Sequence, residues 1–190
     1  MTISILRNAR TLLATLPLCA AFGAHAGDYS GQIAYHNDIV QHTFTIAERS
    51  HLVAWTDSYL GGLNFDPIVA LWRDGALLGE VDDDPSIAPG QTIYDAGLRL
   101  YDLAPGTYLF TIAAYDNFAN GPTLSAGFRF DGQGPIPLAE WCQPASHCNM
   151  GGDLSLHWTL NPVPEPSAWA LLLAGMALIG AGASRWRCAG

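Results

Sequence analysis

Acidic side chains gather at a few points along the chain, and their oxygen atoms suit them to bind a metal ion. Asp82, Asp83 and Asp84 are consecutive and follow an apolar segment. Four more residues of this kind lie near glycine-bearing turns or at the end of apolar segments: Asp57, Asp66, Asp116 and Asn117. Calcium takes about six to eight oxygen ligands from carboxylates, amides and backbone carbonyls, all of which loops supply. These residues predict a calcium site, and the alternative is a solvated acidic turn that discourages edge pairing.

Cys142 and Cys148 are the only cysteines between the two ends of the chain. An isolated pair so close in sequence favours a disulfide if the protein is exported. His147 and His157 lie near enough in sequence to suggest zinc instead. Thiolate zinc sites usually repeat a tighter C-x-x-C spacing. We therefore expect a disulfide and keep zinc as the alternative.

The sequence lacks four common motifs of enzymatic catalysis. The chain has no G-x-S-x-G, H-E-x-x-H, glycine-rich phosphate loop or kinase signature. Serine, histidine and aspartate are present, but a catalytic triad is recognised by its geometry and not by its composition. We expect a protein without enzymatic activity, with a secreted hydrolase as an alternative.

Aromatic residues offer a second kind of binding site. Stacked on one face they would bind a polysaccharide, although most are expected in the core or as cross-strand partners. Tyr59 and Phe118 lie in glycine-bearing loops and are the best candidates for exposure. The full set is Trp55, Tyr59, Phe65, Trp72, Tyr94, Tyr101, Tyr108, Tyr115 and Phe118. A carbohydrate-binding module is therefore the main alternative function.

The N-terminal residues have the three parts of a secretory signal. Arg7 and Arg10 precede an apolar run over residues 11–22, and Ala24-His25-Ala26 follows it. This order of charge, apolar run and small residues is typical of a cleavable signal peptide. We predict a signal peptide over residues 1–26, cleavage after Ala26, and export through the Sec machinery.

The C-terminal residues form a second signal. Pro164-Glu165-Pro166 precedes an apolar stretch over residues 168–183, and Arg185 and Arg187 follow it. The prolines keep the segment extended and open to a protease. The stretch is shorter than the about 20 residues of a usual membrane span, but we expect a membrane-spanning helix with basic residues on the cytoplasmic side.

This C-terminal segment, residues 162–190, resembles a PEP-CTERM sorting domain. The resemblance implies an exosortase, a membrane protease that cuts near the motif. The protein would be held at the inner membrane by the helix and then released to the cell surface or to an extracellular polysaccharide matrix, as in a biofilm.

The body between the two signals is strongly acidic. It holds 16 acidic residues against four arginines, which gives a formal charge of −12, and the chain has no lysine. Such a surface repels nucleic acids and anionic headgroups and attracts cations. Nucleic-acid binding is therefore excluded as a leading function.

Strand patterns recur through the body, with turn formers such as Asp74-Gly75 and Pro105-Gly106 between them. We predict strands at 42–46, 51–56, 68–72, 76–81, 92–94, 98–103, 107–115, 128–130 and 154–160. The pattern indicates an all-β fold of two antiparallel sheets packed as a sandwich.

Two stretches carry a more specific resemblance. They are Phe65-Asp66-Pro67 through Asp82-Asp83-Asp84, and Leu103-Ala104-Pro105-Gly106-Thr107-Tyr108. Their order is similar to that of bacterial pre-peptidase C-terminal domains over about residues 50–130. The resemblance implies a jelly-roll sandwich, which we place at residues 27–161. The loop over residues 142–153 lies outside the resemblance.

Overall fold

The computed structural model describes residues 24–144, 147–164 and 166–187. The predicted signal peptide lies almost wholly outside these residues, and so does Glu165 of the sorting motif. The chain divides into two units, a β-sandwich that ends at Val163 and a separate C-terminal helix.

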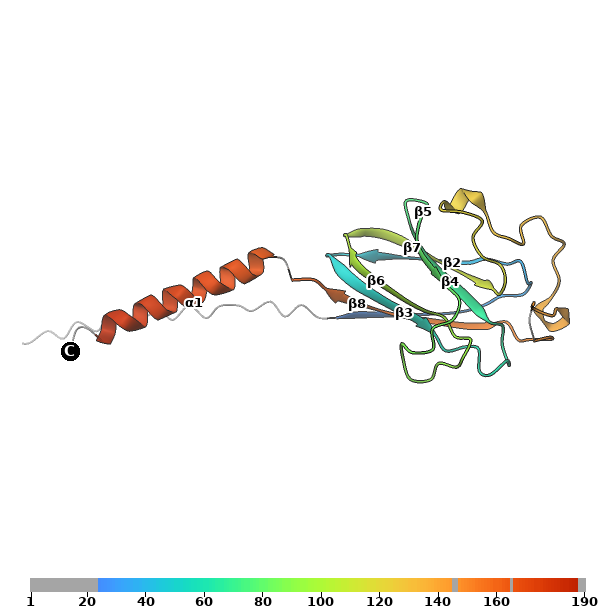
Figure 1. The fold of residues 1–190 in the computed structure, drawn as a ribbon, viewed down its shortest axis with the longest axis horizontal. Helices are drawn as coiled ribbons and strands as arrows, with labels where there is room; N and C mark the ends of the chain where they lie inside the picture. The colour runs from blue at the N-terminus through green and yellow to red at the C-terminus, as the bar shows by residue number, and fades with distance from the viewer. Residues whose placement is uncertain (1–23, 145–146, 165, 188–190) are drawn as a thin grey trace, which may run out of the picture. The chain divides into compact units, whose positions relative to one another are not determined.

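Eight strands and two short 3₁₀ turns make up the sandwich (Figure 1). The strands are β1 (His25–Gln32), β2 (Val40–Ile46), β3 (Ser50–Thr56), β4 (Pro67–Arg73), β5 (Ala76–Val81), β6 (Gly97–Leu103), β7 (Gly106–Ala114) and β8 (Asp153–Pro162). The 3₁₀ turns are η1 (Leu124–Ala126) and η2 (Leu138–Glu140), both between β7 and β8.

The strands form two four-stranded antiparallel sheets. One has the order β1-β8-β3-β6 and the other β2-β7-β4-β5. Apart from the β4–β5 hairpin, neighbouring strands in each sheet come from distant parts of the chain, as in a jelly roll of two Greek keys. The all-β sandwich predicted from the sequence is confirmed.

The core follows from the alternation of side chains along the strands. In β3 the residues Leu52 and Ala54 are buried, and in β8 Leu154 and Leu156 are buried, while their neighbours are more accessible. β4 is buried on both faces except at its last residue. This is unusual for an antiparallel sheet with one solvated face, so something must cover its outer face.

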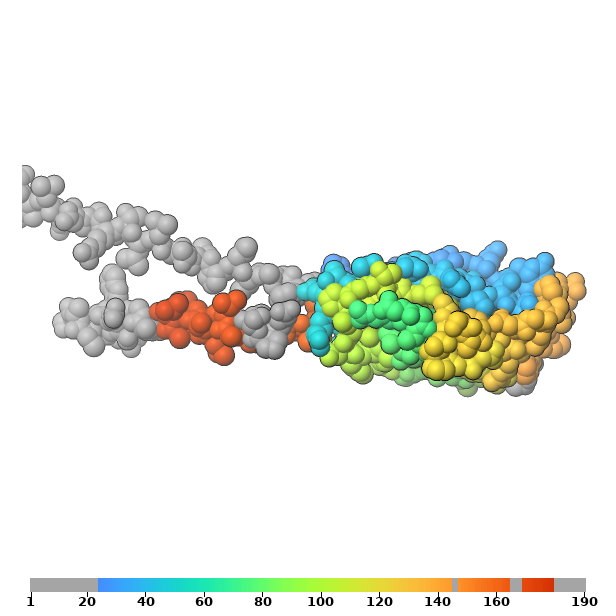
Figure 2. All heavy atoms as spheres, turned by 90° about the horizontal axis from the view of Figure 1, so that it is seen from above, coloured from blue at the N-terminus to red at the C-terminus, as the bar shows by residue number. Residues whose placement is uncertain are grey.

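The cover is the long segment between β7 and β8. Phe128 from this segment packs edge-on against Trp72 of β4, with ring centroids 6.3 Å apart. Figure 2 shows the segment, in yellow and orange, over one end of the sandwich. The predicted strand at 128–130 is therefore wrong: these residues lie in turns that cover a sheet, and those at 92–94 also form no strand.

β1 was not predicted, because its glycines and polar residues lack β-forming side chains. The structure gives a reason for one of them: Gly27 lies opposite Trp158 of β8, and a Cβ at this position would overlap the indole ring. His25 and Ala26 pair with Leu160 and Thr159. Cleavage after Ala26 would therefore shorten β1 by two residues and leave the other pairs of β1 intact.

The second unit is helix α1 (Pro166–Arg187). Arg185 and Arg187 lie in its last turn. Among the described residues, no helix is long and apolar enough to span a membrane. The predicted transmembrane helix is therefore not supported, and its apolar stretch is shorter than the about 20 residues that a span usually needs.

Candidate cation site

Three aspartates meet where the β4–β5 hairpin opens. Asp66 precedes β4, and Asp82 and Asp83 follow β5. The hairpin turns at Asp74 and Gly75, which have positive φ angles of 51° and 76°, as a two-residue turn of type I′ requires. Antiparallel pairing then returns the end of β5 to the start of β4. One carboxylate oxygen from each of the three aspartates lies within 4.8 Å of the other two.

Asp66 is buried without the partners that a buried carboxylate needs. Its side chain is 4% exposed, and its Oδ1 has no hydrogen-bond partner. Asp82 is half-buried, and its Oδ1 also has no partner. Asp83 is exposed at the mouth of the cluster. An unsatisfied buried carboxylate is unfavourable by several kcal/mol unless it is protonated or meets a cation.

The cluster disfavours its own negative charge. Burial, followed by the charges of Asp82 and Asp83, raises the pKa of Asp66 from 3.8 to about 8. Burial, followed by the charges of Asp83 and Asp116, raises the pKa of Asp82 to about 7. Burial also raises the pKa of Asp83. Near neutral pH the cluster therefore holds protons that a bound cation would displace.

The arginines of the body compensate other carboxylates. Their ion pairs are Arg49 with Asp102, Arg73 with Asp74, Arg99 with Asp84, and Arg129 with Asp116. The chain has no lysine. The four arginines of the body thus pair with carboxylates other than Asp66, Asp82 and Asp83.

Gln143 completes the wall of the cavity at this point. The cavity measures about 110 Å³ and is lined by Asp66, Asp82, Asp83, Tyr94, Tyr115, Gln143 and Pro144. Gln143 is 5% exposed, its Nε2 donates to Asp66 Oδ2 at 3.3 Å, and its Oε1 has no partner. Three oxygen atoms, from Asp66, Asp82 and Gln143, are thus buried and unpaired around one small cavity.

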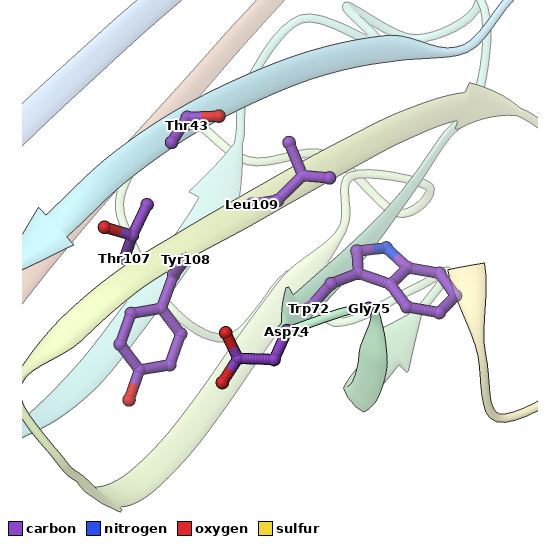
Figure 3. Close-up of a pocket in the computed structure, with 7 residues that line it drawn as sticks. All are labelled: Thr43, Trp72, Asp74, Gly75, Thr107, Tyr108 and Leu109. Carbon is purple, nitrogen blue, oxygen red and sulfur yellow. The ribbon is translucent and has the colours of Figure 1, made fainter. Parts of the chain in front are cut away.

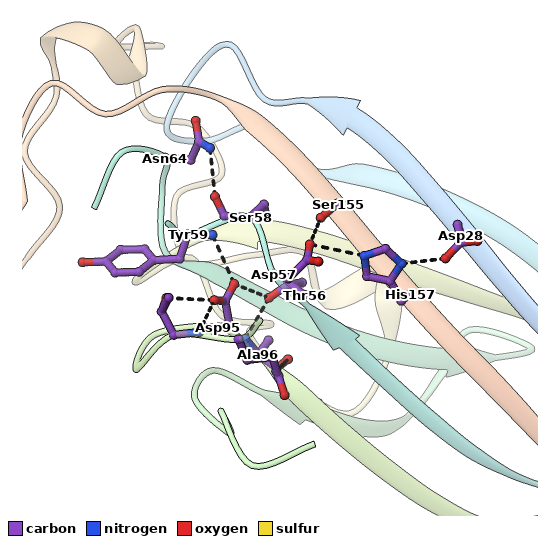
Figure 4. A network of polar contacts seen from close by, with 12 residues as sticks. Asp28, Thr56, Asp57, Ser58, Tyr59, Asn64, Asp95, Ala96, Ser155 and His157 are labelled. Carbon is purple, nitrogen blue, oxygen red and sulfur yellow. Dashed lines mark hydrogen bonds and ion pairs between the residues drawn. The ribbon is translucent and has the colours of Figure 1, made fainter. Parts of the chain in front are cut away.

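A second buried aspartate shows what a satisfied carboxylate looks like in this fold. Asp95 is 0% exposed. It accepts hydrogen bonds from Thr56 Oγ1, Tyr59 N, Thr92 N and Thr92 Oγ1, at 2.7–3.1 Å (Figure 4). Asp66 has a single donor, Gln143, apart from the proton that its carboxyl can share with Asp82. Asp66 therefore differs from Asp95 in having too few hydrogen-bond donors to compensate a buried negative charge.

The other predicted calcium ligands lie outside the cluster. Asp84 accepts from Ser86 and pairs with Arg99 at 2.8 Å, and the Ser86 hydrogen bond first, then the arginine, lowers its pKa. Asp116 pairs with Arg129. The remaining two are Asn117, whose Oδ1 accepts from Phe130 N at 2.7 Å, and Asp57, on the outer face of the other sheet.

Asp57 belongs to a network that contains serine, histidine and aspartate (Figure 4). Ser155 Oγ donates to Asp57, and His157 Nδ1 lies 2.6 Å from Asp28 Oδ1. His157 Nε2 lies 3.2 Å from Asp57 Oδ1, within ion-pair distance although it is not aligned as a hydrogen bond. Burial lowers the pKa of His157, but the close contacts with the Asp28 and Asp57 carboxylates outweigh it, so the net shift is upward. The serine contacts a carboxylate and not the imidazole, so the network lacks the nucleophile–base contact of a triad.

Several of the aromatic residues considered for a sugar-binding surface are buried in the structure. Tyr59 and Trp72 are each 1% exposed, so the expected exposure of Tyr59 is wrong. A hollow of about 180 Å³ on the β2-β7-β4 sheet has Trp72 and Tyr108 in its wall (Figure 3). Both side chains are buried. Trp72 Nε1 donates a hydrogen bond to Thr111 Oγ1, and Tyr108 OH donates one to the Ala104 carbonyl. These two rings pack in the interior.

The structure pairs Cys142 with Cys148, which confirms the predicted disulfide over the zinc alternative. Gln143 is the next residue, and sequence reasoning missed it. Its only signal in the sequence is its place beside a cysteine, in a loop that had no assigned role.

Comparisons with known proteins support the sorting signal predicted at the C-terminal end of the chain. The PEP-CTERM protein-sorting motif matches residues 162–187. Among solved structures, the chain is similar to the pre-peptidase C-terminal domain of a collagenase from Bacillus anthracis. The two share 11% sequence identity, with a TM-score of 0.37, over 71% of this chain and 88% of that domain. No curated protein matches the sequence. The sorting motif predicted from Pro164, Glu165 and Pro166 is confirmed, and it implies an exported protein that an exosortase processes.

Proposed function

We propose that this chain is a non-catalytic protein of the cell envelope or of an extracellular polymer matrix, sorted through its PEP-CTERM motif. Its β-sandwich holds a structural calcium ion between Asp66, Asp82 and Asp83. The observation that carries the proposal is the set of buried, unpaired oxygen atoms around one cavity.

The cluster has the dimensions that calcium needs. Calcium–oxygen bonds of about 2.3–2.6 Å place ligand oxygens at most about 5 Å apart across the ion, and the three carboxylates meet this limit at 4.8 Å. The ligand atoms that the three aspartates offer are all oxygens, which favours a hard cation over zinc or copper. Irregular loop geometry favours calcium over magnesium, which demands a stricter octahedral shell.

A bound ion would stabilise the sandwich without any catalytic step. It would neutralise charge in a body whose formal charge is −12 and would hold together the loops before β4 and after β5. Binding to the folded state alone stabilises it by RT ln(1 + [L]/Kd), or about 2.7 kcal/mol at a hundredfold excess over Kd. This role suits a protein that must persist outside the cell.

Thermal unfolding tests the calcium part of the proposal. We expect the Tm to rise in millimolar calcium, less in magnesium, and to lose the calcium response in Asp66→Ala and Asp83→Ala. Sodium chloride at matched ionic strength controls for screening. If sodium chloride reproduced the whole calcium effect, the cluster would be an acidic loop that binds no specific cation.

Mass spectrometry of the exported protein tests the sorting part. With an active exosortase we expect a mature chain that begins at Gly27 and ends near Pro164, and a retained tail in a Glu165→Ala variant. Secreted protein that still carries residues 168–190 in the presence of the exosortase would refute it.

A further inference from the structure

The residue after Cys142 lies in the wall of the cation cavity, and the disulfide fixes the loop that carries it. Gln143 N donates to the His147 carbonyl at 2.9 Å, and Asn149 N donates to the Trp141 carbonyl at 3.0 Å. Cys142 and Cys148 pair across this short hairpin. The backbone at Gln143 is therefore held in two ways, by the disulfide of the preceding residue and by the hydrogen bond of its own N–H.

Both ends of the hairpin are anchored to the sandwich. Trp141 packs against the hydrophobic core and against Phe130, with ring centroids 6.1 Å apart. At the other end, Tyr59 OH lies 3.0 Å from His147 Nε2, and Tyr59 itself is buried. The hairpin is thus held between two aromatic contacts, with Gln143 between them.

The side-chain amide of Gln143 makes a hydrogen bond through its nitrogen but none through its oxygen. Nε2 donates to Asp66 Oδ2, while Oε1 is buried and unpaired beside the cavity that Asp66, Asp82 and Asp83 line. A neutral carbonyl oxygen is a good calcium ligand, and it adds no charge to a cluster that already repels itself. A buried amide oxygen without a partner is otherwise unfavourable.

We propose that Gln143 is the fourth protein ligand of the cation site, and that the Cys142–Cys148 disulfide holds its Oε1 in place. The inference rests on the proposed calcium function and adds a ligand and a redox dependence to it. Because free thiols would release the hairpin, the oxidised protein binds calcium more tightly than the reduced one. Reduction here means transfer of two electrons and two protons from a dithiol, which becomes a disulfide itself.

Calcium titration of the full chain, followed by calorimetry, tests the ligand. We expect Gln143→Met, which keeps the length but removes the oxygen, to weaken Kd by about tenfold or more. Gln143→Glu keeps an oxygen at this position, so it should bind calcium more tightly than Gln143→Met does. Gln41→Met, at an exposed position on β2, is the matched control and should bind as the unmodified protein does.

The same titration tests the disulfide, with Cys142→Ser/Cys148→Ser and with dithiol-reduced protein. We expect a loss similar to that of Gln143→Met, and little further loss when the two changes are combined, because they remove the same ligand. If the serine variant does not fold, the Gln143 variants still decide, since they keep the disulfide.

The outcomes separate the two proposals. Calcium binding in the unmodified protein with normal Kd in Gln143→Met would overturn the ligand inference and leave the three-aspartate site. Normal Kd in folded, disulfide-free protein would overturn the role of the disulfide. No calcium binding by the unmodified protein would overturn the proposed function as well.

Discussion

Asp66→Asn should stabilise the calcium-free protein at alkaline pH, which is the reverse of the usual effect of a buried polar substitution. The carboxyl of Asp66 has its pKa raised from 3.8 to about 8, first by burial and then by Asp82 and Asp83. The folded state therefore holds a proton that the unfolded state has lost. Stability falls as pH rises from about 4 to about 8, because over this range the folded state binds more protons.

The magnitude follows from the size of the shift. At about 1.4 kcal/mol per tenfold change in acid constant, a rise from 3.8 to about 8 disfavours folding by at most about 6 kcal/mol. Screening by solvent and the nearby Asp82 carboxyl, which can share the proton, reduce this figure, so we expect about 2–4 kcal/mol. Asparagine has no charge, and its Nδ2 can donate to the unpaired oxygens of Asp82 or Gln143. For a domain of this size the gain corresponds to a Tm higher by about 5–15 °C.

The assay is thermal unfolding in EDTA at pH 4 and at pH 9, with and without calcium. The gain from Asp66→Asn should be small at pH 4, where Asp66 is protonated, and large at pH 9, and the calcium response should disappear. Asp84→Asn is the matched control within the aspartate triplet. Its pKa is lowered, first by Ser86 and also by Arg99, so its charge contributes stability that is present above the pKa of the unfolded state and lost as pH falls. That control should lose stability at pH 9 and keep the calcium response. A lower Tm for Asp66→Asn at pH 9 in EDTA would refute the reasoning.

Two further predictions concern the sheet that contains β1. Gly27→Ala should destabilise the sandwich by about 1–3 kcal/mol, because the added Cβ overlaps Trp158; in chemical denaturation, Gly134→Ala, which has open space around it, should be near neutral, and equal effects would disprove the packing argument. His157 has a raised pKa, so its share of stability is full below about pH 6.5 and declines as pH rises through the folded pKa. NMR titration should show a lower pKa for His157 in Asp57→Asn, and an unchanged value would show that Asp57 has no part in the shift.

The sandwich was predictable because its signals are local. Alternating apolar residues in β3 and β8 and turn pairs such as Asp74-Gly75 reveal strands and hairpins within a few residues. β1 was not predictable, because its Gly27 is required by Trp158, a residue on another strand. β4 gave a continuous apolar run, but the sequence does not say that the segment after β7 covers it.

The cation site was predictable only in part, for the same reason. Asp66, Asp82 and Asp83 are recognisable as acidic residues that flank neighbouring strands. Whether an aspartate is free to bind an ion depends on its partners, and Asp84 has its own in Ser86 and Arg99. Gln143 stands 77 residues from Asp66 and meets it only because the loop before β8 returns to the hairpin end.

Anomalous diffraction from crystals grown with calcium tests the central claim most directly. We expect one anomalous peak in the cavity, about 2.3–2.6 Å from oxygens of Asp66, Asp82 and Asp83 and from Gln143 Oε1. A well-ordered cavity without such a peak at saturating calcium, or a peak bound elsewhere with these oxygens still unpaired, would contradict it.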